Sequence, residues 1–133
     1  MKPVHPSLRG TLVALALSTV GLLAAAAPDA TRGEQLYVRC LACHALATDR
    51  VGPRHCGVVG RRAGAVAGFD YSPAMKKSGL VWNAKTLDRF LTKPLALVPG
   101  SSMTYDGVPD AAERSDLIAY LKKASTQAAC QLN

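Results

Sequence analysis

The sequence predicts a small all-α domain with three main helices joined by long loops. Three segments carry helix-start signals followed by helix-forming residues, and the segments between them are rich in glycine and proline. The first 26 of the 133 residues have a different composition, typical of a secretory signal peptide, which leaves 27–133 for folding. A chain of this length is expected to form one domain with a single core.

The predicted signal peptide at 1–26 has a basic start, an apolar run over 12–23 and small residues over 24–27. We expect cleavage after Ala26, because small residues then stand one and three positions before the cut. The apolar run is shorter than the roughly 20 residues that span a bilayer, and an uncleaved anchor is the alternative. The mature domain is therefore expected in the periplasm.

The charge of the mature domain is basic. Removing Lys2 and Arg9 with the signal leaves 14 Lys and Arg against 9 Asp and Glu, a formal net charge of +5. The charges are scattered, few aromatic residues accompany them, and the chain is exported, so nucleic acid is not expected as a partner. We interpret the charge as favouring solubility and docking to anionic proteins.

The first helix is predicted from a capping box, because Thr31 is followed three residues later by Glu34. It would run through 35–38 towards two cysteines. Gly33 and Tyr37 are spaced to share one face, where the glycine permits close approach of another helix.

The stretch Cys40-Leu41-Ala42-Cys43-His44 has the spacing at which a c-type haem is attached. Each thiol can add to one vinyl group of the porphyrin while the adjacent imidazole coordinates the iron. A Cys-x-x-Cys pair could also belong to a thioredoxin-like redox site or to half of a zinc site. The first needs a βαβ unit and the second another ligand pair, and the sequence indicates neither. The export signal and a methionine downstream favour one covalently attached haem c.

The remaining elements follow the haem motif. Residues 45–72 are expected to form ordered turns around the cofactor. Asn83 can cap a second helix, which Pro94 ends and whose apolar stripe is Leu87, Phe90 and Leu91. Asp110 and Glu113 have the capping-box spacing before a final helix over 111–124, with Leu117, Ile118, Tyr120 and Leu121 at its apolar positions.

With these residues placed, the chain resembles the class I c-type cytochromes of bacteria and mitochondria over nearly all of 27–133. The similar stretches are the haem motif, Val51-Gly52-Pro53, Gly57 through Gly60-Arg61-Arg62, Gly68-Phe69-Asp70-Tyr71, Trp82, Pro99-Gly100-Ser101-Ser102-Met103 and 116–123. The resemblance implies the cytochrome c fold, wrapped around one haem. It also implies that the first helix crosses the last, with Gly33 and Tyr37 against Leu117 and Tyr120.

The resemblance implies that Met103 is the second axial ligand of the iron, opposite His44. A thioether favours ferrous iron and raises the reduction potential relative to a second imidazole. Met75 is the alternative, although its loop lacks the Pro-Gly turn. The Pro53 carbonyl would accept the Nδ1 hydrogen of His44, which leaves Nε2 for iron.

A buried haem propionate needs hydrogen-bond donors or a neutralising charge. The resemblance assigns this role to Arg61, Tyr71, Trp82 and Ser101. For Tyr71 and Trp82, plain aromatic core packing is the alternative.

Three departures from the family pattern bear on reduction potential and partner choice. Phe90 stands where many relatives have a tyrosine bonded to the methionine sulfur, and Met75 where a polar side chain often supports the propionate network. Lysines around the exposed haem edge of mitochondrial relatives are replaced by Leu95, Ala96 and Ser102. The flanks of the edge are therefore expected to carry Leu95, Ala96, Leu97 and Val98, with Lys76, Lys77 and Lys93 as the remaining cations.

Two further cysteines, Cys56 and Cys130, lie outside the haem motif. Spare thiols in an oxidising compartment are more often paired than free, and the family fold would bring the loop of Cys56 near the end of the last helix. We therefore expect a Cys56–Cys130 disulfide. His55 is expected at the surface, with iron ligation in the unfolded protein as the alternative.

The function implied by the resemblance is that of a monomeric one-electron carrier that is not an enzyme. Its expected partners are a membrane cytochrome bc-type reductase and an oxidase, reaction centre or periplasmic reductase. Two filled axial positions leave no open site for a substrate. The alternatives are a haem-based peroxidase or gas sensor, in which Met103 would leave the iron, and a permanent subunit of a larger respiratory complex.

Overall fold

The structure, a computed structural model, describes residues 1–2 and 26–131. The predicted signal peptide therefore lies, apart from 1–2 and 26, outside the described residues. Within the described part the regular structure is helical except for one isolated β-bridge between Arg62 and Val81, which confirms the all-α prediction. No helix of this part is long and apolar enough to cross a membrane.

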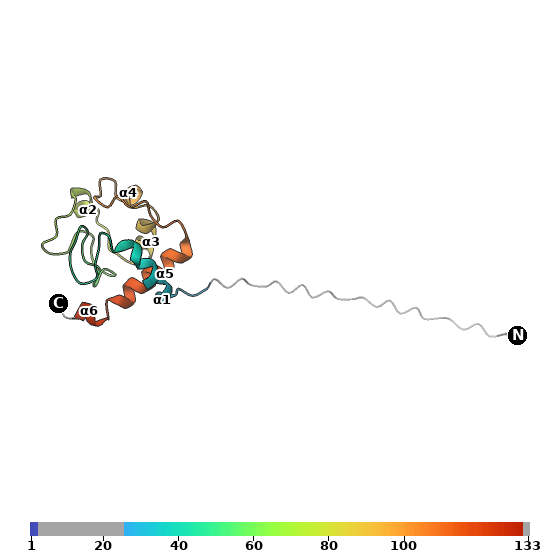
Figure 1. The fold of residues 1–133 in the computed structure, drawn as a ribbon. Coiled ribbons are helices and arrows are strands. Elements are labelled where there is room, and N and C mark those ends of the chain that lie inside the picture. Colours follow the sequence, from blue (N-terminus) through green and yellow to red (C-terminus); the bar gives the residue numbers. More distant parts are fainter. Residues whose placement is uncertain (3–25, 132–133) are drawn as a thin grey trace.

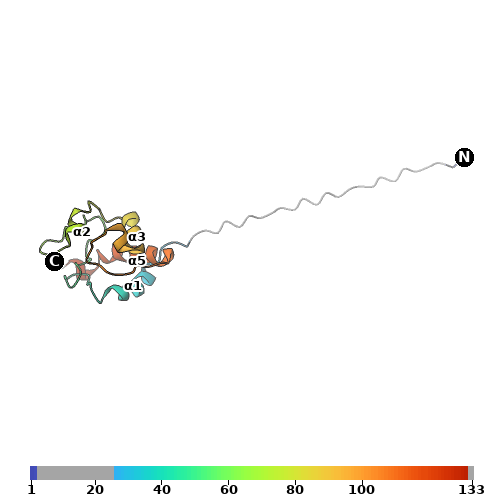
Figure 2. The same ribbon diagram turned by 90° about the horizontal axis from the view of Figure 1, so that it is seen from above.

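The helices differ greatly in length, and only the three main ones were expected. In chain order they are α1 (Ala30–Tyr37), the 3-10 helix η1 (Val38–Cys40), α2 (Pro73–Lys77), α3 (Ala84–Thr92), α4 (Pro94–Leu97), α5 (Ala111–Ala124) and α6 (Ala128–Gln131). Residues 45–72 contain no helix, as predicted. Figures 1 and 2 show α1 lying against α5 on one side of the domain, with long loops and shorter helices making up the rest.

The start of α1 corrects the prediction. Asp29, not Thr31, is the N-cap residue, and its carboxylate accepts hydrogen bonds from the backbone N–H groups of Thr31 (2.8 Å) and Arg32 (3.3 Å). A carboxylate at this end also interacts favourably with the helix dipole. The Asp29 N–H in turn donates to Asp116 in α5 (2.7 Å), so a tertiary contact fixes where the helix begins.

The crossing of α1 and α5 confirms the close approach predicted at Gly33. A Cβ atom at Gly33 would lie 2.8 Å from the Cβ of Tyr120, and still closer to the backbone carbonyl of Asp116. The ring of Tyr37, one turn later, is buried with its centroid 5.2 Å from that of Tyr120. The crossing thereby fixes the position of η1, which carries Cys40.

The second main helix, α3, begins as predicted at Asn83. The Asn83 side chain accepts from the backbone N–H of Thr86 (3.0 Å), and the Thr86 hydroxyl accepts from that of Asn83 (2.9 Å). The helix ends before Pro94 because Lys93 adopts an extended conformation, as residues before proline usually do. Pro94 then occupies the first turn of α4. The buried residues of α3 are Leu87, Phe90 and Leu91.

The last main helix, α5, has the predicted bounds. The Asp110 carboxylate accepts from the backbone N–H of Glu113 (2.8 Å) and so caps the first turn. Arg114 is also buried, which the apolar pattern did not indicate, and its Nε donates to Asp88 of α3 at 2.7 Å. The predicted apolar face is buried throughout: Leu117, Ile118, Tyr120 and Leu121.

Candidate cofactor site

A cavity of about 420 Å³ lies between the helices and the loops, within the size range of small-molecule and cofactor sites. Much of its wall is apolar and includes Val58, Leu87, Leu117 and Leu121. The structure brings all nine residues predicted to contact a haem to this one cavity: Cys40, Cys43, His44, Pro53, Arg61, Tyr71, Trp82, Ser101 and Met103.

The two thiols of the haem motif stand at the end of η1 and in the turn that follows. The N–H groups of Cys43 (3.1 Å) and His44 (2.8 Å) both donate to the Cys40 carbonyl, so the motif is a tight turn. Both thiols are free, and burial raises the pKa of Cys40 to about 11. No group of three or more His, Cys, Asp or Glu side chains among the described residues could hold a metal ion, so a zinc site lacks further ligands there.

The imidazole of His44 is buried, and its Nδ1 lies 2.8 Å from the Pro53 carbonyl oxygen. A carbonyl can only accept, so Nδ1 carries the hydrogen and Nε2 keeps the lone pair that a metal requires. Burial lowers the pKa of His44 and thus favours the neutral ring. Gly52 leaves room for this ring, since a Cβ there would lie 2.6 Å from Nε2.

Two methionines line the cavity. Met103 follows a turn in which Gly100 has a φ of +88°, a conformation that favours glycine, and its N–H donates to the Ser101 hydroxyl at 3.2 Å. Met75 lies in α2 and belongs to the buried apolar core, whereas Met103 is only partly buried. Both sulfur-bearing side chains predicted as candidates therefore reach the site.

Arg61 supplies a test of whether these residues fit a haem. Its guanidinium donates to the carbonyls of Cys56 (2.9 Å) and Arg54 (2.8 Å), while its buried Nε has no hydrogen-bond partner in the described structure. A buried donor without an acceptor is costly, and Arg61 lines the cavity, so a propionate bound there fits this need. Burial lowers the pKa of Arg61, although a guanidinium stays charged at neutral pH.

The aromatic residues predicted beside the propionates lie next to Arg61. The backbone N–H of Trp82 donates to the Arg61 carbonyl at 2.9 Å, and the indole ring is buried with its centroid 4.9 Å from that of Phe90. The Tyr71 hydroxyl accepts a long hydrogen bond from the Val66 N–H (3.4 Å), and burial raises the pKa of Tyr71. Both side chains thus combine core packing with exposure to the cavity.

The prediction that His55 lies at the surface is wrong. His55 lines the cavity, and its ring is stacked on that of His44 with centroids 4.1 Å apart and planes at 22°. A hydrogen bond of 3.0 Å joins its Nδ1 to the Tyr37 hydroxyl, and burial lowers the pKa of His55 to about 3. The only local sequence signal was the proximity of His55 to Pro53, whose carbonyl bonds His44.

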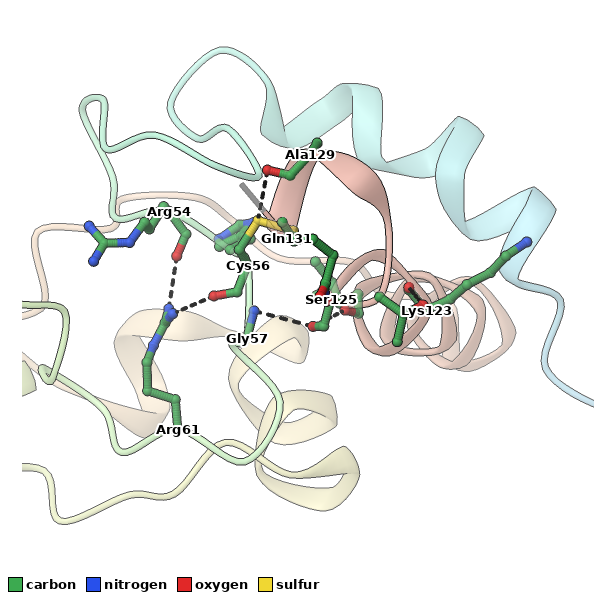
Figure 3. Close-up of a disulfide and its surroundings, with 12 residues drawn as sticks. Arg54, Cys56, Gly57, Arg61, Lys123, Ser125, Ala129 and Gln131 are labelled. Atoms are coloured by element: carbon green, nitrogen blue, oxygen red, sulfur yellow. Dashed lines mark hydrogen bonds between the residues drawn. A yellow bond between two sulfur atoms is a disulfide. The ribbon is translucent and has the colours of Figure 1, made fainter. Parts of the chain in front are cut away.

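Cys56 and Cys130 lie together, with their Cα atoms 5.3 Å apart, a separation that a disulfide can span. Cys130 belongs to α6, and Figure 3 shows Cys56 where its loop meets the end of α5 and the start of α6. The N–H of Gly57 donates to the Ser125 hydroxyl at 3.2 Å beside them. The structure therefore supplies the proximity that the predicted pairing requires.

The rim expected to flank the cofactor is less apolar than predicted. Leu95 is 43% exposed and Ala96 is exposed, but Leu97 is half-buried. Val98 is buried in the apolar core, so the prediction that it lies on the rim is wrong. The predicted cations, Lys76, Lys77 and Lys93, are all exposed.

Comparison with known proteins gives consistent matches. The family model described as Cytochrome c matches residues 30–125. Cytochrome c2 of Rhodomicrobium vannielii is 46% identical over 99 residues, covering 72% of this chain and 79% of that protein, and cytochrome c 2.1 of Caenorhabditis elegans is 41% identical over 104 residues, covering 76% and 94%. The solved structure of cytochrome cH from Methylobacterium extorquens is 43% identical, covers 71% of this chain and 98% of its own, and superposes with a TM-score of 0.70.

Proposed function

Because the chain belongs to the cytochrome c family, whose members are electron-transfer proteins with a covalently attached haem c, we propose that it is a periplasmic one-electron carrier with His44 and Met103 as iron ligands. The observation that carries the proposal is the convergence of the nine predicted site residues on one cavity. The attached haem c supplies the redox chemistry, since its iron can hold or release one electron.

The role of His44 follows from its fixed tautomer. The hydrogen bond to Pro53 keeps the hydrogen on Nδ1 and leaves Nε2 able to bind iron, and such a partner also increases the basicity of the ligand. Cys40 stands four residues before His44 and Cys43 directly before it, and both would anchor the porphyrin by thioether bonds.

Met103 is the better second ligand for structural reasons. Met75 lines the cavity but belongs to the buried core at α2, so binding a metal would draw it away from part of that packing. Met103 is partly buried, lines the cavity and is positioned by the turn at Gly100 and Ser101. A neutral thioether and a neutral imidazole need little rearrangement when the charge on the iron changes by one.

The remaining polar residues of the cavity would hold the propionates. Arg61 provides a permanent positive charge and the unpartnered Nε, while Tyr71, Trp82 and Ser101 line the same cavity. Neutralising a buried carboxylate in this way avoids a cost of several kcal/mol.

The partners in this proposal are membrane-bound and periplasmic redox proteins. We assign a cytochrome bc-type reductase as electron donor and an oxidase, reaction centre or periplasmic reductase as acceptor. The predicted export signal and the net charge of +5 on 27–133 support a periplasmic carrier that docks on anionic surfaces.

The proposal is tested with holoprotein purified from its native periplasm. When the holoprotein is added to native membranes, the bc-type complex should reduce it and the acceptor should reoxidise it. The haem absorbance measures both steps, with and without an inhibitor of that complex. The ferrous protein should not bind carbon monoxide at neutral pH. Met103→Ala is the control that should bind it, because loss of the thioether would leave one coordination position of the iron open. Rapid carbon monoxide binding by the wild type, or peroxide turnover, would favour the sensor or peroxidase alternative.

A further inference from the structure

We propose that His55 is a positioning residue for His44: its ring, held by Tyr37, stacks on the His44 imidazole, fixes the direction of that ring and lowers the reduction potential. The proposal rests on the proposed function, because it takes His44 as an axial ligand.

The first step concerns what fixes the His44 ring. Its Nδ1 has one hydrogen bond, to Pro53 at 2.8 Å. Carbonyl oxygens accept hydrogen bonds over a broad range of directions, so this contact limits the ring's rotation only weakly. The His55 ring covers one face of His44 at a centroid distance of 4.1 Å, and rotation of His44 towards that face would cause a clash.

The second step concerns what holds His55. Its backbone N–H donates to the carbonyls of Ala45 and Leu46, both at 3.0 Å, and its Nδ1 is hydrogen bonded to the Tyr37 hydroxyl. Tyr37 is only 3% exposed and packs against Tyr120 in the crossing of α1 and α5. A continuous line of contacts therefore leads from the rigid helix crossing to the proximal imidazole.

The third step distinguishes this arrangement from plain packing. An aliphatic side chain could fill the same space without placing a polar ring in the wall of an apolar cavity. The π-face of a neutral imidazole carries partial negative charge, and it is presented here to His44. A ligand ring becomes more positive when the iron it binds is ferric, so the stack favours the ferric state.

The experiment compares four holoprotein variants by redox titration and by the haem-methyl proton shifts of the ferric form, which report the direction of axial ligand rings. His55→Leu should raise the potential and change the methyl pattern, and His55→Phe, which keeps a ring face, should restore most of both. Tyr37→Phe should shift both in the direction of His55→Leu but by less. Val59→Ala, a partly buried core change that does not line the cavity, should lower stability without moving either readout.

An unchanged potential and methyl pattern in His55→Leu would overturn the proposal, and so would equal shifts in His55→Leu and His55→Phe. If His55→Leu does not accumulate, an unchanged methyl pattern in Tyr37→Phe overturns it. A wild type that is not low-spin would contradict the proposed ligation itself. A low-spin wild type that is insensitive to His55 would remove only the role of His55.

Discussion

Two polar side chains that line the cavity, His44 and Arg61, are hydrogen bonded to backbone carbonyls of the loop after the haem motif. The Pro53 carbonyl fixes the tautomer of His44, while the carbonyls of Arg54 and Cys56 accept hydrogen bonds from the guanidinium of Arg61. Each carbonyl can only accept, so each also determines where the hydrogens of its partner lie. The chemistry of the cavity therefore depends on the conformation of a segment that has no helix or strand of its own.

Met103→Ala should leave the haem covalently attached, because Cys40 and Cys43 are untouched. It should convert the site to a high-spin form or to another ligand, with a large fall in reduction potential, since a thioether favours ferrous iron. Absorption spectra and redox titration measure both effects. Met75→Leu is the matched control and should keep the low-spin spectrum. The reverse outcome, with Met103→Ala unchanged and Met75→Leu altered, would move the ligand to Met75.

His55 shows which part of the site could not be predicted from sequence. The spacing of one short motif indicated the two thiols and His44, and the family resemblance implied the roles of Pro53 and Met103. A single histidine carries no such signal, because its burial depends on Tyr37, 18 positions earlier, and on the stack with His44. Contacts of this kind exist only after the chain has folded.

The helices differ in how far their ends could be predicted. The caps of α3 and α5 are local, since Asn83 pairs with Thr86 and the Asp110 side chain with the Glu113 backbone, three residues apart. For α1 the sequence predicted Thr31 as the cap, whereas the cap is Asp29, whose N–H donates to Asp116, 87 positions away. The short helices α2, α4 and α6 form only by packing, because isolated helices of under about 12 residues are marginal in water.

Asp116 links α5 to the start of α1 and should make folding pH-dependent. Its carboxylate accepts from the Asp29 N–H and from Nε of Arg32, and these contacts hold the pKa of Asp116 below its ordinary value. A lowered folded-state pKa adds stability that is fully present above the unfolded-state pKa and is lost as pH falls through the folded-state value. The free energy of unfolding of Asp116→Asn should therefore fall furthest below that of the wild type at neutral pH, and this difference should shrink below about pH 4.

Denaturant unfolding of the holoproteins between pH 3 and 7 measures this difference. Asp70→Asn is the control, because Asp70 is fully exposed and an ion pair in solvent, such as the one with Lys76, contributes little to stability. A constant difference between Asp116→Asn and the wild type across the pH range would mean that the carboxylate charge does not support the helix crossing.

The whole domain is closed at its C-terminal end by the contact between Cys56 and Cys130, 74 positions apart in the sequence. We predict that they form a disulfide. Cys56→Ser/Cys130→Ser should then lower the free energy of unfolding by up to about 4 kcal/mol, because the disulfide reduces the conformational entropy of the unfolded chain. The haem spectrum should persist, since neither residue lines the cavity. Non-reducing mass spectrometry of the native protein decides the pairing, and two freely alkylated thiols would contradict it.

The surface by which the whole molecule meets its partners should depend only modestly on charge. Leu95 and Ala96, expected from the family resemblance to stand where mitochondrial proteins carry lysines, are exposed, and so are the predicted cations Lys76, Lys77 and Lys93. Electrostatic steering between exposed charges is screened over about 8 Å at physiological salt, so a charge-guided encounter slows steeply as salt rises. The second-order rate of electron transfer to the native acceptor should therefore fall less steeply with salt for the wild type than for Leu95→Lys/Ala96→Lys. Leu95→Gln/Ala96→Gln, which adds no charge, should keep the shallow slope of the wild type. Equal slopes for the wild type and the lysine variant would show that cations elsewhere on the domain dominate recognition.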